Sequence, residues 1–355
     1  MAILHPQECY LLERFTSLDY YRRRWQAWRD FVAHCEQQVE LFAQHLPAGH
    51  RDRPLWQQYD VVWNNRILPN IRGTLSILQR DYVQRQHNDP RAYFTGGNVA
   101  SDCKGISEYW PEHWMSKAAL ERYGDLLGLG RVYDHVMEIT TDSIWSEGSL
   151  TYRYSEFAFG PLDLPLQIPR YALDPSVVLG PDEPVTVTGL YLPDVEYAGA
   201  QFFHPRSFVP HTAKQGRKRS DFIDEDIGER DYTWEITEKV PATWTLIRRV
   251  ENEFISVPPQ GFFPNGRPDE LYHWPEQEQA LLTGEQKHLT LLSGEVCPHD
   301  GIWSTFQTKG IERRHFSQGD ILPQWQTGKE DFRPIHWTLL ERDDGGAIQF
   351  PGGAR

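Results

Sequence analysis

Two nearly identical hexapeptides occur in this chain of 355 residues, WTLIRR at 244–249 and WTLLER at 337–342. In both places a proline stands three residues before the tryptophan, at Pro241 and Pro334. In an extended strand, successive side chains alternate between the two faces, so the Trp and the third-position Leu would share one face and the Thr would lie on the other. The pattern predicts a β-strand for each copy.

The agreement continues upstream of the hexapeptides. Gly-Leu-Tyr begins at Gly189 and Gly-Ile-Trp at Gly301, and each is followed by a hydrophobic-hydrophobic-Pro triplet that ends at Pro210 or Pro323. Short sequence motifs that recur in the same order predict a tandem duplication. We expect each copy to form a small, strongly bent β-module.

The two copies differ by an insertion. Pro210 lies 34 positions before the first hexapeptide, whereas Pro323 lies 14 positions before the second. The extra residues, about 213–232, begin with basic side chains and then turn acidic, which is typical of a solvated hairpin tip or of a loop that docks a partner. On the second interpretation, the candidate partner-binding residues are acidic: Asp221, Asp224, Glu225, Asp226 and Glu229.

The first part of the chain carries helical periodicity. Apolar residues spaced by three and four predict an amphipathic helix of about 29 residues, capped at Thr16; they are Leu18, Tyr21, Trp25, Trp28, Val32, Cys35, Val39, Phe42 and Leu46. Such a stripe is the seam of an antiparallel bundle or of a dimeric coiled coil. We favour the bundle because a further helical pattern follows from Leu55 to Tyr82, with a kink or break at Pro69.

Turn-forming residues then predict a long loop at 88–107, followed by helices from Ser116 to Leu127 and over 131–140. From Leu150 onward, β-prone residues and recurrent prolines replace the helical pattern. The predicted fold class is therefore α+β: an N-terminal antiparallel helical bundle at 1–145 and a mainly β C-terminal half of two related small β-modules, 146–255 and 256–355.

Composition limits the classes of partner. An apolar content of 39% with 13% aromatic residues is typical of a folded, soluble protein. The net charge of -14 disfavours nucleic acid and favours a basic protein partner. No apolar run is long enough for a membrane span and no secretory leader is recognisable, so we expect a cytoplasmic protein without a membrane partner.

Catalytic and metal-binding patterns are weak. The sequence contains no nucleotide-binding loop, nucleophile elbow or zinc-protease motif. Cys297, His299 and His315 lack a fourth ligand at a sensible spacing, and the loop carboxylates have no apolar walls to separate their pKa values. The basic run Arg22–Arg24 fits a solvated helix flank. We therefore expect no metal, no cofactor and no enzymatic activity.

Four stretches, taken in order, resemble a known group of proteins. LLERFTSLDYYRRRWQAWRDFV near the start, SGEVCPHDGIW at 293–303, GDILP at 319–323 and PIHWTLLERDD at 334–344 are similar to the immunity protein 71 and 72 families of bacterial polymorphic-toxin and type VI secretion loci. Those families combine a helical N-terminal half with a C-terminal β-region that carries a G-x-x-x-P-x-x-G-x-W type motif. The matching residues are Gly294, Pro298, Gly301 and Trp303.

The resemblance implies a function. An immunity protein of this kind binds and neutralises one cognate toxin domain, delivered by a Rhs-type or other type VI effector, by steric occlusion in the cytoplasm. The motif residues are then expected to form the scaffold: Gly189, Trp244, Gly294, Pro298, Gly301, Trp303, Pro323, Trp337 and Arg342. Two alternatives remain open at this point: an enzyme that reverses the toxin's modification or acts on carbohydrate, and a scaffold that forms a homodimer through the helical seam.

Overall fold

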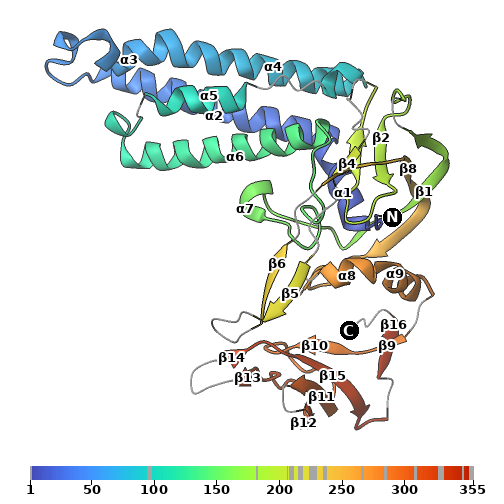
Figure 1. Ribbon diagram of the computed structural model, residues 1–355. Coiled ribbons are helices and arrows are strands. Elements are labelled where there is room, and N and C mark those ends of the chain that lie inside the picture. The colour runs from blue at the N-terminus through green and yellow to red at the C-terminus, as the bar shows by residue number, and fades with distance from the viewer. Residues whose placement is uncertain are drawn as a thin grey trace. The chain divides into compact units, whose positions relative to one another are not determined.

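The computed structural model describes residues 2–93, 98–109, 111–180, 183–205, 207, 212–214, 219–223, 230–234, 238–264, 268–283, 286–307, 310–326, 332–345 and 348–351. The chain divides into two compact units, Met1–Tyr272 and His273–Arg355. The first contains the N-terminal helices and one four-stranded antiparallel sheet, and the second contains another such sheet (Figure 1). The predicted α+β class is confirmed.

The described helices of the first unit include three long ones that lie side by side, α2, α4 and α6 (Figure 1). Their bounds are α1 (Pro6–Phe15), α2 (Leu18–Gln44), α3 (Tyr59–Val62), a π-helical turn (Trp63–Ile67), α4 (Leu68–Gln86), α5 (Val99–Ser107), α6 (Lys117–Thr141), α7 (Glu156–Phe159) and α8 (Pro268–Tyr272).

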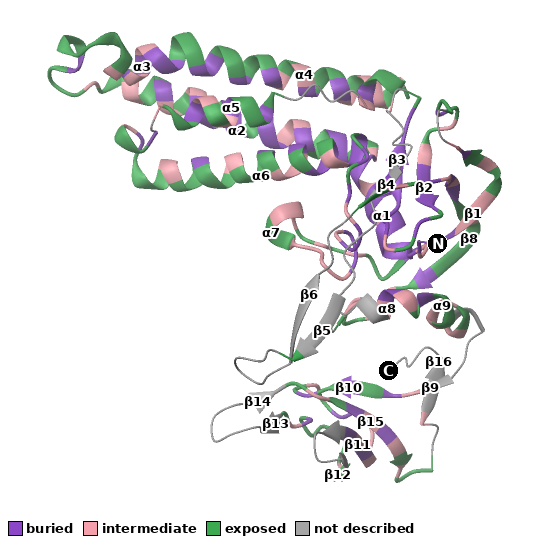
Figure 2. Cartoon of the chain, viewed as in Figure 1, coloured by how far each residue is buried: buried purple, intermediate pink, exposed green. Residues whose placement is uncertain are grey.

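Helix α2 matches the predicted amphipathic helix. Its apolar stripe is buried against α4, α5 and α6, where the Trp28 indole Nε1 donates to the Ile71 carbonyl at 3.0 Å. Figure 2 shows buried and exposed residues interleaved along this helix, as its spacing requires. The cap differs from the prediction: Ser17 Oγ accepts from the Tyr20 N–H, whereas the Thr16 hydroxyl bonds back to Leu12 at the end of α1.

The middle of the predicted seam is enclosed within the first unit. Trp28, Val32, Cys35 and Val39 lie in one apolar cluster with residues of the neighbouring helices. Leu18, at the start of the predicted seam, is exposed, and dimerisation through the seam stays a prediction.

Three sequence predictions for the later helices need correction or refinement. Pro69 stands in the first turn of α4, where its missing N–H costs nothing, and the preceding π-helical turn absorbs the irregularity. The loop predicted at 88–107 contains α5, because Val99 and Ile106 turn apolar side chains into the bundle. Ser116 caps α6 as predicted, but α6 continues to Thr141 without the expected interruption.

Arg24 also differs from the prediction of a solvated helix flank. The first two arginines of the run, Arg22 and Arg23, are solvated and pair with Asp19 on the helix surface. Arg24 is buried: its Nε donates to Asp134 of α6 at 2.8 Å, and its Nη1 lies 3.5 Å from a carboxylate oxygen of Asp81 of α4. One charged residue thus links the three long helices.

The first sheet lies next to the helices in the same unit. Its order is β1-β8-β2-β3, with β1 (Gln167–Leu179), β2 (Gly189–Pro193), β3 (Gln201–Phe203) and β8 (Trp244–Ser256). Leu190 and Ile247 of the sheet share one core cluster with Leu12 of α1 and Met137 of α6. The first strand, β1, begins only at Gln167, and the helix α7 lies at Glu156–Phe159, where the sequence pattern predicts strand, so the change from helix to strand falls later than the predicted residue 146. The helices and the first four-stranded sheet belong to one compact unit.

The second sheet repeats the first. Its order is β10-β15-β11-β12, with β10 (Thr290–Leu292), β11 (Gly301–Gln307), β12 (Gly310–Phe316) and β15 (His336–Arg342). The two hexapeptides therefore occupy the same second position in their sheets. The register agrees as well, since Tyr191 pairs with Leu246 in the first sheet and Trp303 pairs with Leu339 in the second.

The tryptophans of the two hexapeptides occupy matching environments. Trp244 packs edge-to-face on Phe203 at 4.8 Å between ring centroids, and Trp337 packs edge-to-face on Phe316 at 5.0 Å. Both indoles are buried. The Trp337 Nε1 also donates to the Pro323 carbonyl at 3.0 Å, which ties the ILP triplet to the strand. These equivalences support the duplication inferred from the sequence.

A pair of short strands stands at the same place in each copy. In the first copy β4 (Thr212–Lys214) pairs with β7 (Lys239–Pro241), and in the second β13 (Trp325–Gln326) pairs with β14 (Phe332–Arg333). The first copy inserts a further hairpin between its two strands, made of β5 (Arg219–Ile223) and β6 (Arg230–Trp234) (Figure 1). The remaining described elements of the second unit are α9 (Trp274–Thr283) and the paired strands β9 (Gln286–His288) and β16 (Gln349–Pro351).

Candidate functional site

The predicted acidic partner-binding residues belong to the inserted hairpin. Asp221 lies in β5, in register with Tyr232 of β6. Asp224, Glu225, Asp226 and Glu229 fall between the two strands and lie outside the described residues. The strand β5 ends at Ile223, which is 67% exposed. The described residues of the segment are thus two paired strands with an apolar side chain facing solvent at the end of β5.

The predicted motif residues of the second unit form its framework. Gly294, at φ +91°, donates its N–H to the Leu322 carbonyl at 2.7 Å, and the Cys297 N–H donates to Asp320 at 2.7 Å. The segment that leads through Pro298 to β11 is therefore held against the GDILP stretch. The two motifs that resemble immunity proteins are adjacent in space because they complete each other's backbone hydrogen bonds.

Gly301 begins β11 where no larger residue fits. A Cβ atom there would lie 2.1 Å from the Glu341 carbonyl oxygen of β15, and one at Gly189 would lie 2.9 Å from a methyl group of Leu246. Trp303 is buried two residues further along β11. Arg342, in register with Gly301 at the end of β15, pairs with Asp344. These positions are explained by packing.

The weak metal candidate does not assemble. The Cys297 thiol is buried and donates to the His299 carbonyl at 3.2 Å, and burial raises the pKa of this thiol. His315 lies on β12, where its Nε2 is 2.7 Å from an Asp343 carboxylate oxygen. Over the described residues, no three His, Cys, Asp or Glu side chains gather as ligands.

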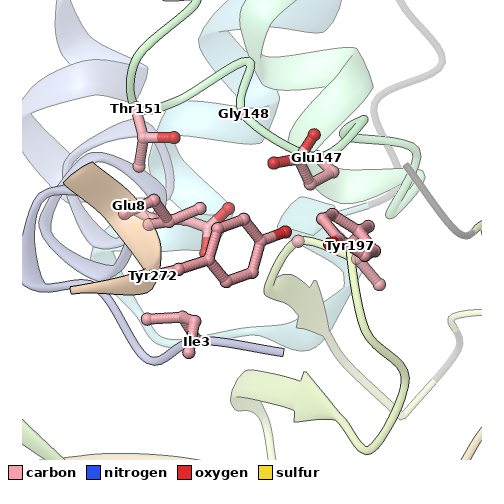
Figure 3. A pocket seen from close by; sticks show the side chains of 10 residues that line it. Ile3, Glu8, Glu147, Gly148, Thr151, Tyr197 and Tyr272 are labelled. Atoms are coloured by element: carbon pink, nitrogen blue, oxygen red, sulfur yellow. The ribbon is translucent and has the colours of Figure 1, made fainter. Parts of the chain in front are cut away.

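Two carboxylates that the sequence analysis did not single out meet in the first unit. Glu8 lies on α1 and Glu147 lies in the turn after α6; both are buried and both line a cavity closed by Tyr272 of α8 (Figure 3). The Tyr152 hydroxyl donates to the Glu147 carboxylate at 2.7 Å, and the Arg153 guanidinium lies 3.2 Å from it. The pair combines ionisable groups from distant parts of the chain.

Burial dominates the electrostatics of this pair. It raises the pKa of Glu8 to about 8; a backbone hydrogen bond from Ala200 opposes the rise, and the nearby Glu147 carboxylate adds to it. Burial also raises the pKa of Glu147, while the Tyr152 hydrogen bond and the Arg153 charge oppose that shift. Near neutral pH, Glu8 therefore carries a proton in the folded protein.

The cavity itself is small. Its volume is about 10 Å³, which is the space of a single water molecule. A sugar ring does not fit, so this pair does not supply the carboxylate cleft that the carbohydrate alternative requires. No sequence signal marks Glu8 or Glu147, because their proximity depends on the packing of α1 against the turn after α6.

A larger, open groove of about 580 Å³ lies where the helices meet the first sheet. Its charged side chains are already paired. Arg249 forms an ion pair with Glu13 at 2.6 Å, and Arg85 donates to the Thr16 carbonyl while its guanidinium lies over the Tyr93 ring. The groove has the volume of a ligand site, but its cations are held by neighbours within the protein.

Exposed apolar side chains occur at the far end of the bundle. Leu55 and Trp56, in a 3₁₀ turn before α3, are 69% and 68% exposed. Trp is enriched where proteins bind one another. Other large apolar side chains are exposed as well, including Phe157 of α7 at 96% and Leu166 at 89%, so exposure alone does not single out one docking surface.

Comparison with known proteins gives no relative. No family model, curated protein or solved structure matches the chain. A membrane-crossing helix is likewise not found in the described part of the chain.

Proposed function

We propose that the protein is an immunity protein, which binds a cognate toxin domain and neutralises it by steric occlusion. The order of sequence motifs that resemble the immunity protein 71 and 72 families supports the proposal. Most of the described motif residues have structural roles, as buried tryptophans, tight glycines and paired loops. A family that keeps such a framework can vary its surface to recognise different toxins.

Among the structural features, the inserted β5–β6 hairpin gives the proposal its main support. The second copy builds the same four-stranded sheet and the same short strand pair with only residues 327–331 between β13 and β14. The sheet does not need residues 215–238, so their retention is best explained by binding. Their acidic stretch and the net charge of -14 suit a cationic toxin, since long-range attraction raises the association rate.

Co-expression with the toxin encoded by the neighbouring gene tests the function. We expect relief of killing and a complex that co-elutes on gel filtration. Continued killing together with separate elution would refute the proposal.

A loop exchange tests the docking site. Residues 215–238 are replaced by TGKED, the sequence of 327–331, which already connects the equivalent strands in the second copy. We expect a folded protein with a melting temperature within about 4 °C of the original, because the framework is retained. We also expect that its affinity for the toxin falls at least about tenfold and that protection is lost.

The matched control is a charge reversal elsewhere. Glu121 and Asp125 are exposed on α6, so changing both to lysine alters the net charge without touching the hairpin. This variant should still protect. Full protection by the loop-exchange variant would show that the toxin binds another surface.

A further inference from the structure

The open groove beside the first sheet follows the edge of one strand. In the sheet order β1-β8-β2-β3, β8 pairs with β2 only from Trp244 to Ile247, whereas β1 accompanies β8 as far as Ser256. Past Ile247, the β2 side of β8 has no strand partner in the described part of the chain. Four consecutive residues of β8, Leu246 to Arg249, line the groove, although their side chains alternate between the two faces of the sheet. The groove therefore runs along this open edge and not over one face.

An open strand edge presents unpaired backbone N–H and C=O groups, which are a template for an added strand. The open edge of β8 is short, because its pairing with β1 is interrupted between Arg249 and Phe254, and Asn252 there adopts φ +59°. β2 begins at Gly189, which also lines the groove. A strand added beside Arg248 and Arg249 would thus lie in line with β2 and extend its place in the sheet.

Arg85 of α4 brings an uncompensated positive charge to the groove. Its Nε donates to the Thr16 carbonyl at 3.1 Å, and its Nη1 donates to the side-chain oxygen of Asn88 at 3.0 Å. Its guanidinium also lies over the Tyr93 ring. These partners are all neutral, and the Nη2 group has no acceptor among the described residues. A carboxylate that enters the groove would gain a charge-assisted hydrogen bond from Arg85 without breaking an ion pair.

The other charged side chains that line the groove balance one another. Arg249 pairs with Glu13 at 2.6 Å, and Arg248 pairs with Asp174 at 2.5 Å. One surplus positive charge, that of Arg85, therefore remains at the groove of a protein whose net charge is -14. The local charge favours an acidic occupant, whereas the charge of the whole chain does not.

We infer that the groove binds an extended acidic segment of a partner protein, which adds a strand to the open edge of β8 and places a carboxylate on Arg85. Backbone hydrogen bonds supply affinity in this mode of recognition, and the side-chain contact supplies specificity. Sites for small molecules enclose most of the ligand in a mainly apolar pocket. This groove is open and lined in part by charged side chains, which suits a chain that continues past its ends. The inference does not depend on the proposed immunity function.

Fluorescence anisotropy of a labelled peptide tests the site. The probe is an octapeptide of alternating Thr and Glu, titrated with the full-length protein in about 0.1 M NaCl. We expect saturable binding, and binding at least about tenfold weaker for the octapeptide of alternating Thr and Gln. General electrostatic attraction does not explain such a preference, because the net charge of the protein repels the acidic peptide.

Two variants test the role of the arginine. Arg85→Gln should weaken binding of the acidic peptide about tenfold, because the only uncompensated charge at the groove is removed. Arg72→Gln is the matched control, since Arg72 is exposed on the same helix and pairs with Glu36. The control should leave the affinity unchanged. Absence of saturable binding by the original protein, or equal affinities of the two variants, would overturn the inference.

Two N-methylated peptides test the added strand with the original protein. Alternate residues of a strand direct their N–H groups to the same side, so methylation of every Glu nitrogen or of every Thr nitrogen blocks one side only. One of the two peptides should lose binding and the other should keep it. Equal affinities of both methylated peptides and the parent would show that the groove binds carboxylates without strand pairing, which would overturn the inference.

Discussion

Replacing Arg24 with methionine is expected to destabilise the first unit strongly. The change keeps the unbranched apolar stem of the side chain but leaves the Asp134 carboxylate, 2.8 Å from Arg24 Nε, without its charged partner inside the bundle. Removing one member of a buried ion pair costs about 3–5 kcal/mol. Asp81 retains Arg80 at 3.0 Å, and burial already raises the pKa of this aspartate, so proton uptake limits its share of the cost.

The assay is urea unfolding followed by circular dichroism of the helices, with Arg22→Met as the matched control. Arg22 lies on the same helix, and its partner Asp19 is solvated, so the control should lose less than about 1 kcal/mol. Adding Asp134→Leu to Arg24→Met should recover most of the loss, because the unpaired charge is then gone. If Arg24→Met costs no more than Arg22→Met, the ion cluster does not stabilise the bundle and the argument from burial is wrong.

Two further predictions concern single residues. Burial lowers the pKa of His5 from 6.5 to about 3, so below pH 6.5 the unfolded state binds the proton more readily than the folded state. The free energy of unfolding should therefore fall by up to about 5 kcal/mol as the pH drops toward 3. His5→Asn, which can still cap α1, should show a shallower decline when urea unfolding is measured across this range. Gly301→Ala should lower the free energy of unfolding by more than about 2 kcal/mol, because its Cβ would collide with the Glu341 carbonyl. Gly124→Ala, open to solvent on α6, should raise it by up to about 1 kcal/mol. Similar melting temperatures for the two variants would contradict this assignment.

Local patterns in the sequence were sufficient for much of the fold. The three-and-four spacing along α2 and the repeated hexapeptides depend on which side chains face a core, and that periodicity is written in the order of residues. The matching registers of Tyr191 with Leu246 and of Trp303 with Leu339 follow from the same repeated sequence motifs. The helix α5 was missed because its turn-forming residues outweighed two apolar side chains that only the bundle explains.

Tertiary structure alone decided the electrostatics. Arg22 and Arg24 have the same chemistry and lie on one helix, yet one is solvated and the other links three helices, because only the second faces carboxylates of α4 and α6. Glu8 and Glu147 are far apart in the chain and acquire their raised pKa values from desolvation in a shared cavity. The sequence by itself determined the long helices and the repeated strands, since these depend on neighbours along the chain, but it did not determine α5 or α7, whose residues predict a loop and a strand. The environment of a buried charge depends on neighbours in space, and only the folded arrangement supplies them.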